Sequence, residues 1–351
     1  MFFTAMKAFI TGGAGFIGSK LSVALVNQGF EVCGYDNFHK QVHGENPDKN
    51  FPFNIVDGDV RDLDKLSDAI GRFVPDIIYH LAAETGTGQS FDEPSRYVDV
   101  NVTGTSNLFE ACRLAGVKPK KVILASSRAV YGEGLYVNSS GEAVEACTRE
   151  SAKMAKGDFA VYDQFGQKLI PQPTPESLQP KPDSVYASTK LMQEFLVKNL
   201  AIDFDWSILR FQNVYGPGQS LTNPYTGVLS IFCSQIKSSQ ILEVYEDGEI
   251  YRDFVYVDDV VKSLINAIKA PPAHVFNIGS GFPVSILEVV KLLLGIAQSK
   301  NYSAEYKITG KFRDGDIRFA QADIQKADKL LNWKPKISLK EGLAQLTNWS
   351  F

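Results

Sequence analysis

The stretch "ITGGAGFIGSKL", residues 10–21, joins an apolar run to a segment with helical spacing. Gly13, Gly15 and Gly18 match the pattern G-x-G-x-x-G, and Gly12 in place of Gly13 gives the variant G-x-x-G-x-x-G. A strand, a glycine turn and a helix in this order let backbone N–H groups hold a pyrophosphate at the helix N-terminus. The stretch therefore predicts a dinucleotide-binding turn.

Two aspartates extend this prediction. Asp36 ends the run "EVCGYD", eighteen residues after Gly18. A carboxylate at this place accepts both ribose hydroxyls of an adenosine, and its charge repels a 2′-phosphate, so we expect NAD rather than NADP. Asp59 ends the next run and is expected near the adenine amino group.

Short apolar runs alternate with amphipathic segments through the first 211 residues. The runs are "KAFIT", "EVCGYD", "FNIVDGD", "DIIYHLA", "KVILASS" and "WSILRF". Strands that are apolar on both faces and separated by helices belong to a parallel sheet covered on both sides. We therefore predict an α/β fold with a Rossmann-type, doubly wound parallel sheet.

The pattern changes after about residue 210. Helices at 224–236, 285–296 and 323–331 and strands at "ILEVYEDG" and "YRDFVYV" predict a smaller mixed α/β region towards the C-terminal end. A polar, proline-bearing segment at about 133–183 interrupts the first region. Because a loop of this length is usually functional or disordered, we expect an insertion beside the site, and a disordered segment is the alternative.

Composition excludes several classes of protein. The chain has 351 residues and a net charge of −4, so no basic field favours nucleic acid. Four cysteines without a C-x-x-C pair indicate buried reduced thiols rather than a zinc site, and we expect no metal. Because there is neither a signal peptide nor a run long enough to span a membrane, we expect a cytoplasmic protein.

A tyrosine and a lysine in "SVYASTK" suggest acid–base chemistry. Tyr186 precedes Lys190 by four residues, which places both on one face of a helix. An ammonium within about 4–6 Å stabilises a phenolate, so we expect Tyr186 to act as a base near neutral pH. Ser127 in "ASSRAVYG" is expected to bond the same substrate oxygen, and Lys190 to reach the nicotinamide ribose.

These motifs, in order, carry a resemblance. "TGGAGFIG", "HLAA" at 80–83, "SSRAVYG" and "YASTK" resemble the extended short-chain dehydrogenase/reductase family of nucleotide-sugar epimerases and dehydratases. The later segments "LRFQNVYGPG", "YRDFVYVDDV", "FNIGSG" and "FRDGDIRFAQADI" match as well. The resemblance therefore covers almost the whole chain.

The resemblance implies a role for many individual residues. Catalysis would fall to Ser127, Tyr186 and Lys190. NAD would be bound by these last two together with Gly12, Gly15, Phe16, Ile17, Gly18, Asp36, Asn37, Asp59, Val60, Leu81, Ala82, Ala83, Asn101 and Phe211. The substrate would be bound by Ser127 together with Glu84, Thr85, Arg128, Asn213, Arg252, Arg313 and Asp316.

It also implies a domain division and a dimer. Residues 1–209 and about 251–280 would form the NAD-binding domain, and 210–250 with 281–351 the nucleotide-sugar-binding region. Members of the family pair through the helix before "GVKPKK" and the helix that carries Tyr186, so we expect a homodimer. Apolar residues on these two segments are Leu108, Cys112, Leu191, Phe195 and Leu196.

The reaction follows from what stands after Ser127. The 4,6-dehydratases of this family carry an Asp-Glu pair there, whereas this chain has Arg128 and Ala129. A 4-epimerase needs neither carboxylate, because oxidation of C4 to a transient ketone makes the centre planar and the hydride returns on the other face. NAD is regenerated in each turnover. We therefore expect a nucleotide-sugar 4-epimerase.

The substrate is expected from a narrower similarity. "HLAAETGTGQS", "RYVDVNVTGT" and the long insertion are similar to dTDP-L-rhamnose 4-epimerases, which form dTDP-6-deoxy-L-talose. The insertion departs from those relatives at Asn138, Tyr162 and Phe165, near the places of their cysteines. Three alternatives stay open: a UDP-hexose, UDP-N-acetylhexosamine or UDP-hexuronate 4-epimerase, a 4-ketosugar reductase, and a non-enzymatic NAD-sensing protein.

Overall fold

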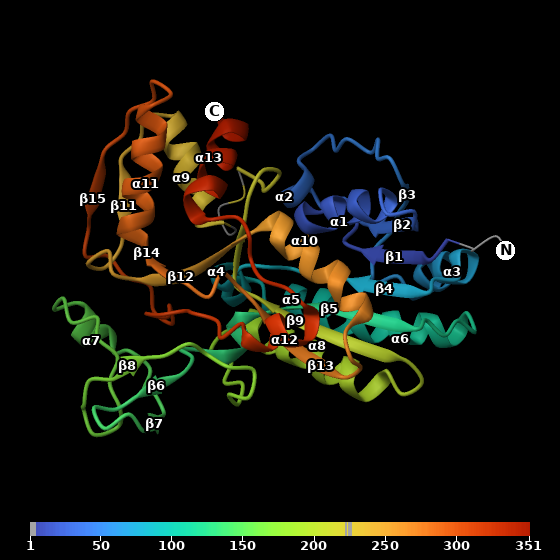
Figure 1. Ribbon diagram of the computed structural model, residues 1–351, viewed down its shortest axis with the longest axis horizontal. Helices are drawn as coiled ribbons and strands as arrows, with labels where there is room; N and C mark the ends of the chain where they lie inside the picture. The colour runs from blue at the N-terminus through green and yellow to red at the C-terminus, as the bar shows by residue number, and fades with distance from the viewer. Residues whose placement is uncertain (1–4, 222, 224–226) are drawn as a thin grey trace.

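A computed structural model describes residues 5–221, 223 and 227–351, and a seven-stranded parallel sheet is at its centre (Figure 1). The strand order is β13-β9-β5-β4-β1-β2-β3, and every neighbouring pair is parallel. This order confirms the predicted doubly wound sheet. The strands are β1 (Lys7–Thr11), β2 (Glu31–Asp36), β3 (Asn54–Asp57), β4 (Ile77–His80), β5 (Lys121–Ser127), β9 (Asp205–Phe211) and β13 (His274–Ile278).

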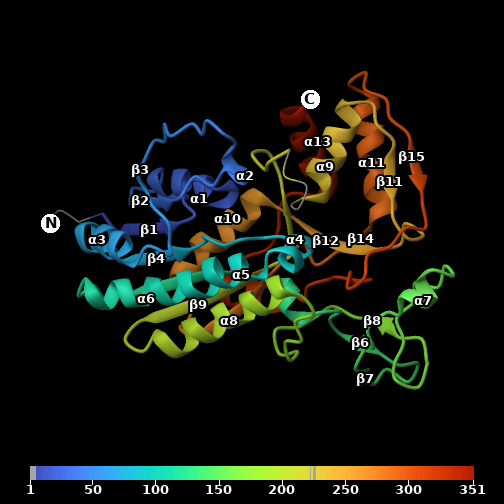
Figure 2. The ribbon, with the colours of Figure 1, turned by 180° about the vertical axis from the view of Figure 1, so that it is seen from behind.

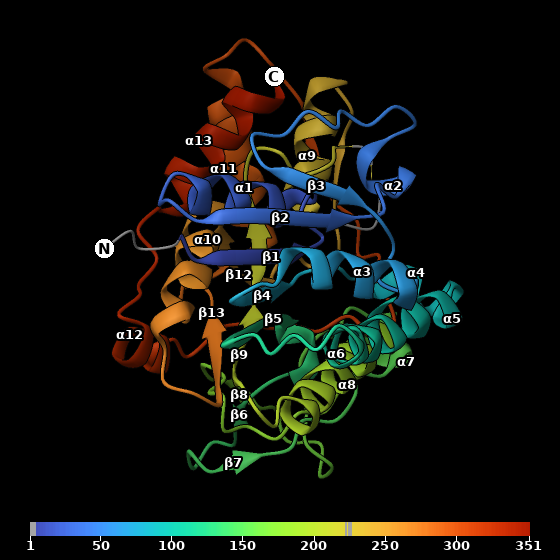
Figure 3. The same cartoon turned by 90° about the vertical axis from the view of Figure 1, so that its right-hand side faces the viewer.

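Helices cover both faces of the sheet because its strands are apolar on both faces (Figure 3). On β5, Ile123 packs towards one face and its neighbours Val122 and Leu124 towards the other, each at 1% exposure or less. The first face is covered by α1 (Phe16–Val26), α10 (Val257–Asn266) and α12 (Gln325–Leu331). The second is covered by α3 (Leu63–Phe73), α6 (Gly104–Leu114) and α8 (Val185–Leu200). Each large side chain buried here stabilises the fold by about 1.5–3 kcal/mol.

A smaller mixed lobe lies beside the sheet (Figure 1). Its strands β10 (Asn213–Tyr215), β12 (Tyr251–Tyr256) and β14 (Pro283–Ser285) form one sheet, and β11 (Leu242–Val244) pairs with β15 (Tyr306–Ile308). Three helices pack around a separate core: α9 (Val228–Lys237), α11 (Ile286–Gln298) and α13 (Leu339–Ser350). The predicted helices correspond to α9, α11 and α12, although residues 224–226 lie outside the described part of the chain.

Several elements were not predicted, among them β10, β13, β14, β15 and α13. A capping box in which Ser338 and Glu341 bond each other's backbone N–H marks the start of α13. The division into two domains stays a prediction, and β12, assigned to the first domain, pairs with β10 and β14 in the small sheet.

The insertion is folded. Three strands form an antiparallel sheet in the order β7-β6-β8: β6 (Tyr136–Val137), β7 (Ala143–Val144) and β8 (Ile170–Pro171). The short helix α7 (Ser151–Met154) lies between β7 and β8 in the chain. Tyr136, Val161 and Leu169 form a small core, and Phe319 from the C-terminal part of the chain packs against it. The insertion therefore docks on a distant segment.

Short elements complete the chain. These are α2 (Lys40–His43), α4 (Thr87–Asp92), α5 (Pro94–Tyr97), a π-helix at Val98–Thr103 and 3₁₀ turns at Arg128–Tyr131 and Ala267–Lys269. Across the described residues, no helix combines the length and apolar character needed to cross a bilayer. The cytoplasmic location stays a prediction.

The cysteines depart from expectation at one position. Cys33, Cys112 and Cys233 are buried free thiols, as predicted. Cys147 is exposed because it lies on the insertion, outside the large cores.

Candidate active site

The glycine turn is packed so closely that side chains have no room. Gly12 has φ +71°, and a Cβ there would lie 2.8 Å from the backbone N of Ala82. A Cβ on Gly18 would overlap the carbonyl oxygen of Gly12, so α1 lies directly against the turn. The N-terminus of α1 therefore faces a cavity of about 450 Å³ at the carboxyl end of the sheet.

This first cavity collects most of the residues predicted to bind NAD. Its walls come from the glycine turn and from the ends of β2, β3, β4, β5 and β9. The predicted residues that line it are Gly12, Gly15, Phe16, Ile17, Gly18, Asp36, Asn37, Asp59, Val60, Leu81, Ala82, Ala83, Tyr186, Lys190 and Phe211. A cradle that any Cβ would fill, at a helix N-terminus, fits a pyrophosphate.

The carboxylate of Asp36 is held in place by the backbone. Its Oδ2 accepts a 3.0 Å hydrogen bond from the N–H of Ala14, and its Oδ1 accepts one of 2.9 Å from Phe38. The Nε2 of His43 lies 3.4 Å from Oδ1, a neighbour that sequence reasoning missed. The carboxylate is 8% exposed and lines the cavity, so its free lone pairs suit ribose hydroxyls.

Asp59 is also fixed. Its side chain accepts hydrogen bonds from the guanidinium of Arg61 at 2.8 and 2.9 Å and from Asn37 at 2.9 Å. Burial raises the pKa of Asp59, but these hydrogen bonds outweigh burial and lower it to about 2. Asp59 therefore stays ionised beside the cavity at neutral pH.

Asn101, which was predicted to bind NAD, does not line the first cavity, and its role towards the cofactor stays a prediction. Asn101 is fully buried behind the wall, in the π-helix. Its side chain accepts a 2.7 Å hydrogen bond from the N–H of Glu84 and donates to Thr189 of α8 at 3.0 Å. These contacts hold the loop after β4 against α8.

Ser127 and Tyr186 stand where the first cavity meets a second. Ser184 caps α8 by accepting a hydrogen bond from the N–H of Ala187, which places Tyr186 in the first turn of the helix. Both Ser127 and Tyr186 line both cavities. Burial raises the pKa of the Tyr186 phenol, and a hydrogen bond with Ser127 acts in the opposite direction.

Lys190 differs from its expected electrostatic role. Its Nζ donates a 3.0 Å hydrogen bond to the carbonyl of Ala125 on β5, and the residue is 4% exposed. Burial lowers the pKa of Lys190 to about 7, while Glu194 opposes this shift. The expected lowering of the Tyr186 pKa is therefore not observed. Burial raises the pKa of the phenol, and the same burial disfavours the charged form of Lys190.

The second cavity, of about 780 Å³, is rich in arginine. Its lining includes the predicted substrate residues Ser127, Arg128, Asn213, Arg252, Arg313 and Asp316. Burial, with Arg252 nearby, lowers the pKa of Arg128 to about 10, so Arg128 stays charged at neutral pH. Arg252 Nη2 lies 2.7 Å from Asp316 Oδ1.

Two predicted substrate residues lie elsewhere. Glu84 and Thr85 line the first cavity and not the second, because the chain after β4 reaches the second cavity only at Gly86. Glu84 also forms a 2.7 Å ion pair with Arg96.

Several lining residues were missed. Asp183 and Gln212 line the second cavity beside Ser127, with Ile231, Phe232, Gln235 and Tyr245 on the side of the small lobe. Arg313 lies over the ring of Tyr245, 5.2 Å from its centroid. These residues come from separate elements, and only two had a family motif at or beside them: Gln212 lies within "LRFQNVYGPG" and Asp183 directly precedes "SVYASTK".

Comparison with known proteins gives the family. A model described as GDP-mannose 4,6 dehydratase matches residues 9–145, and one described as the NAD dependent epimerase/dehydratase family matches residues 159–279. The dTDP-L-rhamnose 4-epimerase of Burkholderia thailandensis is 39% identical over 98% of this chain and 94% of its own length. The chain belongs to the NAD-dependent epimerase/dehydratase family.

Solved structures of family members agree in fold. The UDP-glucose 4-epimerase of Thermotoga maritima, solved with UDP-glucose, is 30% identical with a TM-score of 0.77 and covers 98% of both chains. The UDP-glucuronic acid 4-epimerase of Bacillus cereus, solved with UDP-glucuronic acid and NAD, is 29% identical. Its TM-score is 0.77, and the match covers 98% of this chain and 99% of that one.

The prediction that this chain is an NAD-dependent nucleotide-sugar enzyme is therefore confirmed at the level of the family. The segment that matches the dehydratase model includes Arg128 and Ala129. These two side chains supply neither the acid nor the base of a dehydration.

Proposed function

We propose that this enzyme inverts C4 of dTDP-L-rhamnose, through a 4-keto sugar, to give dTDP-6-deoxy-L-talose. The observation that carries the proposal is the place of Tyr186 and Ser127, at the junction of the glycine-lined cavity and the arginine-lined cavity. A sugar carbon between the two cavities meets a cofactor on one side while its diphosphate extends to the other.

The arginines of the second cavity would hold the diphosphate. Arg252 and Arg313 both line it, and a guanidinium matches phosphate oxygens with paired N–H donors. Asp316 would accept from the hydroxyls of the nucleoside ribose, and Asn213 would bond the phosphate or the sugar. A diphosphate anchored in the second cavity, away from C4, lets the sugar turn without leaving the enzyme.

The chain's own side chains perform the proton chemistry. Bound NAD supplies a hydride acceptor, and its reduced form a hydride donor. Tyr186 would take the proton of the 4-hydroxyl and return it after inversion, while Ser127 bonds the same oxygen. Lys190, fixed by Ala125, would hold the nicotinamide ribose.

The choice of sugar is supported by the relative from Burkholderia thailandensis, whose similarity runs through the insertion. A second candidate is a UDP-hexuronate. Arg128 favours it, because a charged guanidinium beside Ser127 suits a sugar carboxylate. Asp183 argues against a UDP-hexuronate. Its carboxylate lies close enough to Arg128 to raise the pKa of that arginine, and it would repel a sugar carboxylate there.

A substrate panel tests the proposal. The purified protein is incubated with dTDP-L-rhamnose, UDP-glucose, UDP-N-acetylglucosamine and UDP-glucuronate, and products are separated by sugar configuration. We expect a talo product from dTDP-L-rhamnose without net change in NADH absorbance. Epimerisation of UDP-glucuronate alone would favour the second candidate, and stoichiometric NADH consumption would indicate a reductase.

We further propose that two copies pair through α6 and α8, which lie side by side on one face of the molecule (Figure 2). Of the residues expected there, Leu108 and Cys112 are buried in the core of this chain. Phe195 is 47% exposed, and Met192 on the same helix is 45% exposed. Phe195→Asp is expected to shift the sedimentation coefficient from dimer to monomer; a wild-type monomer would contradict the proposal.

A further inference from the structure

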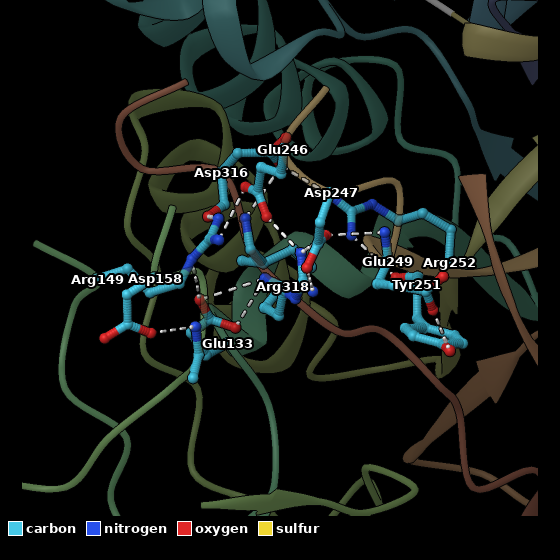
Figure 4. A network of polar contacts seen from close by, with 12 residues as sticks. Glu133, Arg149, Asp158, Glu246, Asp247, Glu249, Tyr251, Arg252, Asp316 and Arg318 are labelled. Atoms are coloured by element: carbon cyan, nitrogen blue, oxygen red, sulfur yellow. Dashed lines mark hydrogen bonds and ion pairs between the residues drawn. The ribbon is translucent and has the colours of Figure 1, made fainter. Parts of the chain in front are cut away.

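A buried charged network joins the insertion to the substrate cavity (Figure 4). Arg149 lies just before α7, and its side chain is only 3% exposed. Its Nη1 pairs with Oε1 of Glu246 at 2.8 Å, and its Nε lies 3.6 Å from Oε1 of Glu133. Arg318 binds the other oxygen of Glu246 at 2.6 Å. A buried arginine between two carboxylates has a fixed geometry.

The network reaches the segment that carries the predicted nucleotide-binding residues. The Nη2 of Arg149 donates to the carbonyl oxygen of Asp316, whose carboxylate pairs with Arg252. Two residues further along the chain, the hydroxyl of Ser151 donates to Asp314. Residues 149–151 therefore hold the turn at 313–316 at two points.

Other contacts make this attachment rigid. Glu246 has φ +53°, in the left-handed region, and its N–H donates to the carbonyl of Lys311 at 2.7 Å. The N–H of Thr174 donates to Gln321 at 2.9 Å, while Phe319 packs on the insertion core. Glu246 thus supports the segment at residue 311, and the insertion contacts it between residues 314 and 321.

Arg149 itself is not a lining residue of the second cavity, whereas Arg313, Asp314 and Asp316 are. It also lies between the two stretches that match the family models, 9–145 and 159–279. Arg149 itself therefore stands outside the matched stretches, whereas its partners Glu133 and Glu246 lie within them.

We infer that Arg149 is a positioning residue, through which the insertion sets the place of the turn 313–316 and thereby the affinity for the nucleotide diphosphate. This rests on the proposed function. The turn carries both Arg313 and Asp316, so its displacement weakens binding of the nucleotide part while Tyr186, Ser127 and the NAD cavity stay in place. The insertion would therefore affect the substrate indirectly, through the position of Arg313 and Asp316.

The test uses Arg149→Met, with Lys153→Met as the matched control. Lys153 is on α7 in the same insertion, but its ion pair is with Glu150 and 44% of its side chain is exposed. For the NAD-loaded Arg149→Met protein we expect about tenfold weaker dTDP binding by calorimetry and an equal rise in KM, as for the loss of one charged hydrogen-bonding group. The kcat and the bound NAD content stay within about twofold of wild type, and the control matches wild type.

Two gentler variants keep the test decisive if Arg149→Met does not fold. Arg149→Lys keeps the charge but not the planar fork, and Ser151→Ala removes only the outer contact. Both are expected to weaken dTDP binding about two- to fivefold, with unchanged NAD content. Wild-type affinity in every soluble variant, or a fall in kcat without a rise in KM, would overturn the inference. If the wild-type protein itself binds neither dTDP nor UDP, the proposed function fails instead.

Discussion

Ser126 of β5 donates a 2.7 Å hydrogen bond to Glu194 of α8. Ser126 precedes Ser127, and Glu194 follows Lys190 by one helical turn, so this contact joins the two elements that carry the side chains proposed to be catalytic. Arg210 on β9 completes the cluster, with 2.7 and 2.8 Å hydrogen bonds to the two oxygens of Glu194. Glu194 is fully buried and Arg210 is 2% exposed.

This cluster gives a prediction for stability. Glu194→Leu leaves the Arg210 charge buried and unpaired, which we expect to cost about 3–5 kcal/mol of unfolding free energy. The double variant Glu194→Leu/Arg210→Met removes both charges and should recover most of that loss. Urea unfolding of the single and double variants measures both effects. A double variant no more stable than Glu194→Leu would refute the account of this pair.

A second prediction concerns acid. His80 is 1% exposed, with its ring nitrogens 2.7 Å from the hydroxyl of Thr11 and 2.8 Å from that of Thr105. Burial, aided by the Lys190 charge, lowers the pKa of His80 to about 3. In the unfolded chain the imidazole of His80 has its ordinary pKa near 6.5, so below that pH it binds a proton that the folded protein does not bind. The free energy of unfolding therefore decreases as pH falls from about 6.5 towards 3.

The measurement is urea unfolding between pH 4.5 and 7.5 for wild type, His80→Gln and the control His274→Gln. The wild-type free energy of unfolding should fall relative to that of His80→Gln by up to about 1.4 kcal/mol per pH unit. The partly exposed His274 bonds the carbonyl of its neighbour Ala273, and its variant should follow the wild-type slope. Parallel curves for wild type and His80→Gln would contradict the buried neutral state of His80.

A third prediction concerns the cofactor. Asp36→Ala removes the carboxylate that is held by Ala14 and Phe38. We expect about tenfold weaker binding of NAD and a reduced preference for NAD over NADP, because the charge that repels a 2′-phosphate is gone. Fluorescence titration with both reduced cofactors measures the preference. An unchanged ratio of the two dissociation constants would refute the ribose role of Asp36.

Much of the fold follows from local patterns in the sequence. The strand "KAFIT" is β1 residue for residue, because apolar side chains on both faces and a following glycine turn admit few alternatives. The glycine turn was located by its spacing after this strand, and Asp36 by its place at the end of the next strand. The strands of the insertion escaped prediction because each is only two residues long, which is too short to show a period.

The site was less predictable where contacts join distant segments. Arg149 and Glu246 are 97 residues apart, and an arginine in a polar segment looks like a solvated one. Asn101 was assigned to the cofactor because the family motif gives its position but not its burial. The pKa of Tyr186 also depends on desolvation, which spacing along a helix does not show.

The central claim is that Tyr186 is the base of an epimerisation at the junction of the two cavities. The most direct measurement is turnover of dTDP-L-rhamnose by Tyr186→Phe beside wild type, with bound NAD and melting temperature determined on the same samples. The account predicts a fall in kcat of about 10²–10⁴-fold with NAD content and melting temperature unchanged. Near-wild-type turnover by Tyr186→Phe would contradict it.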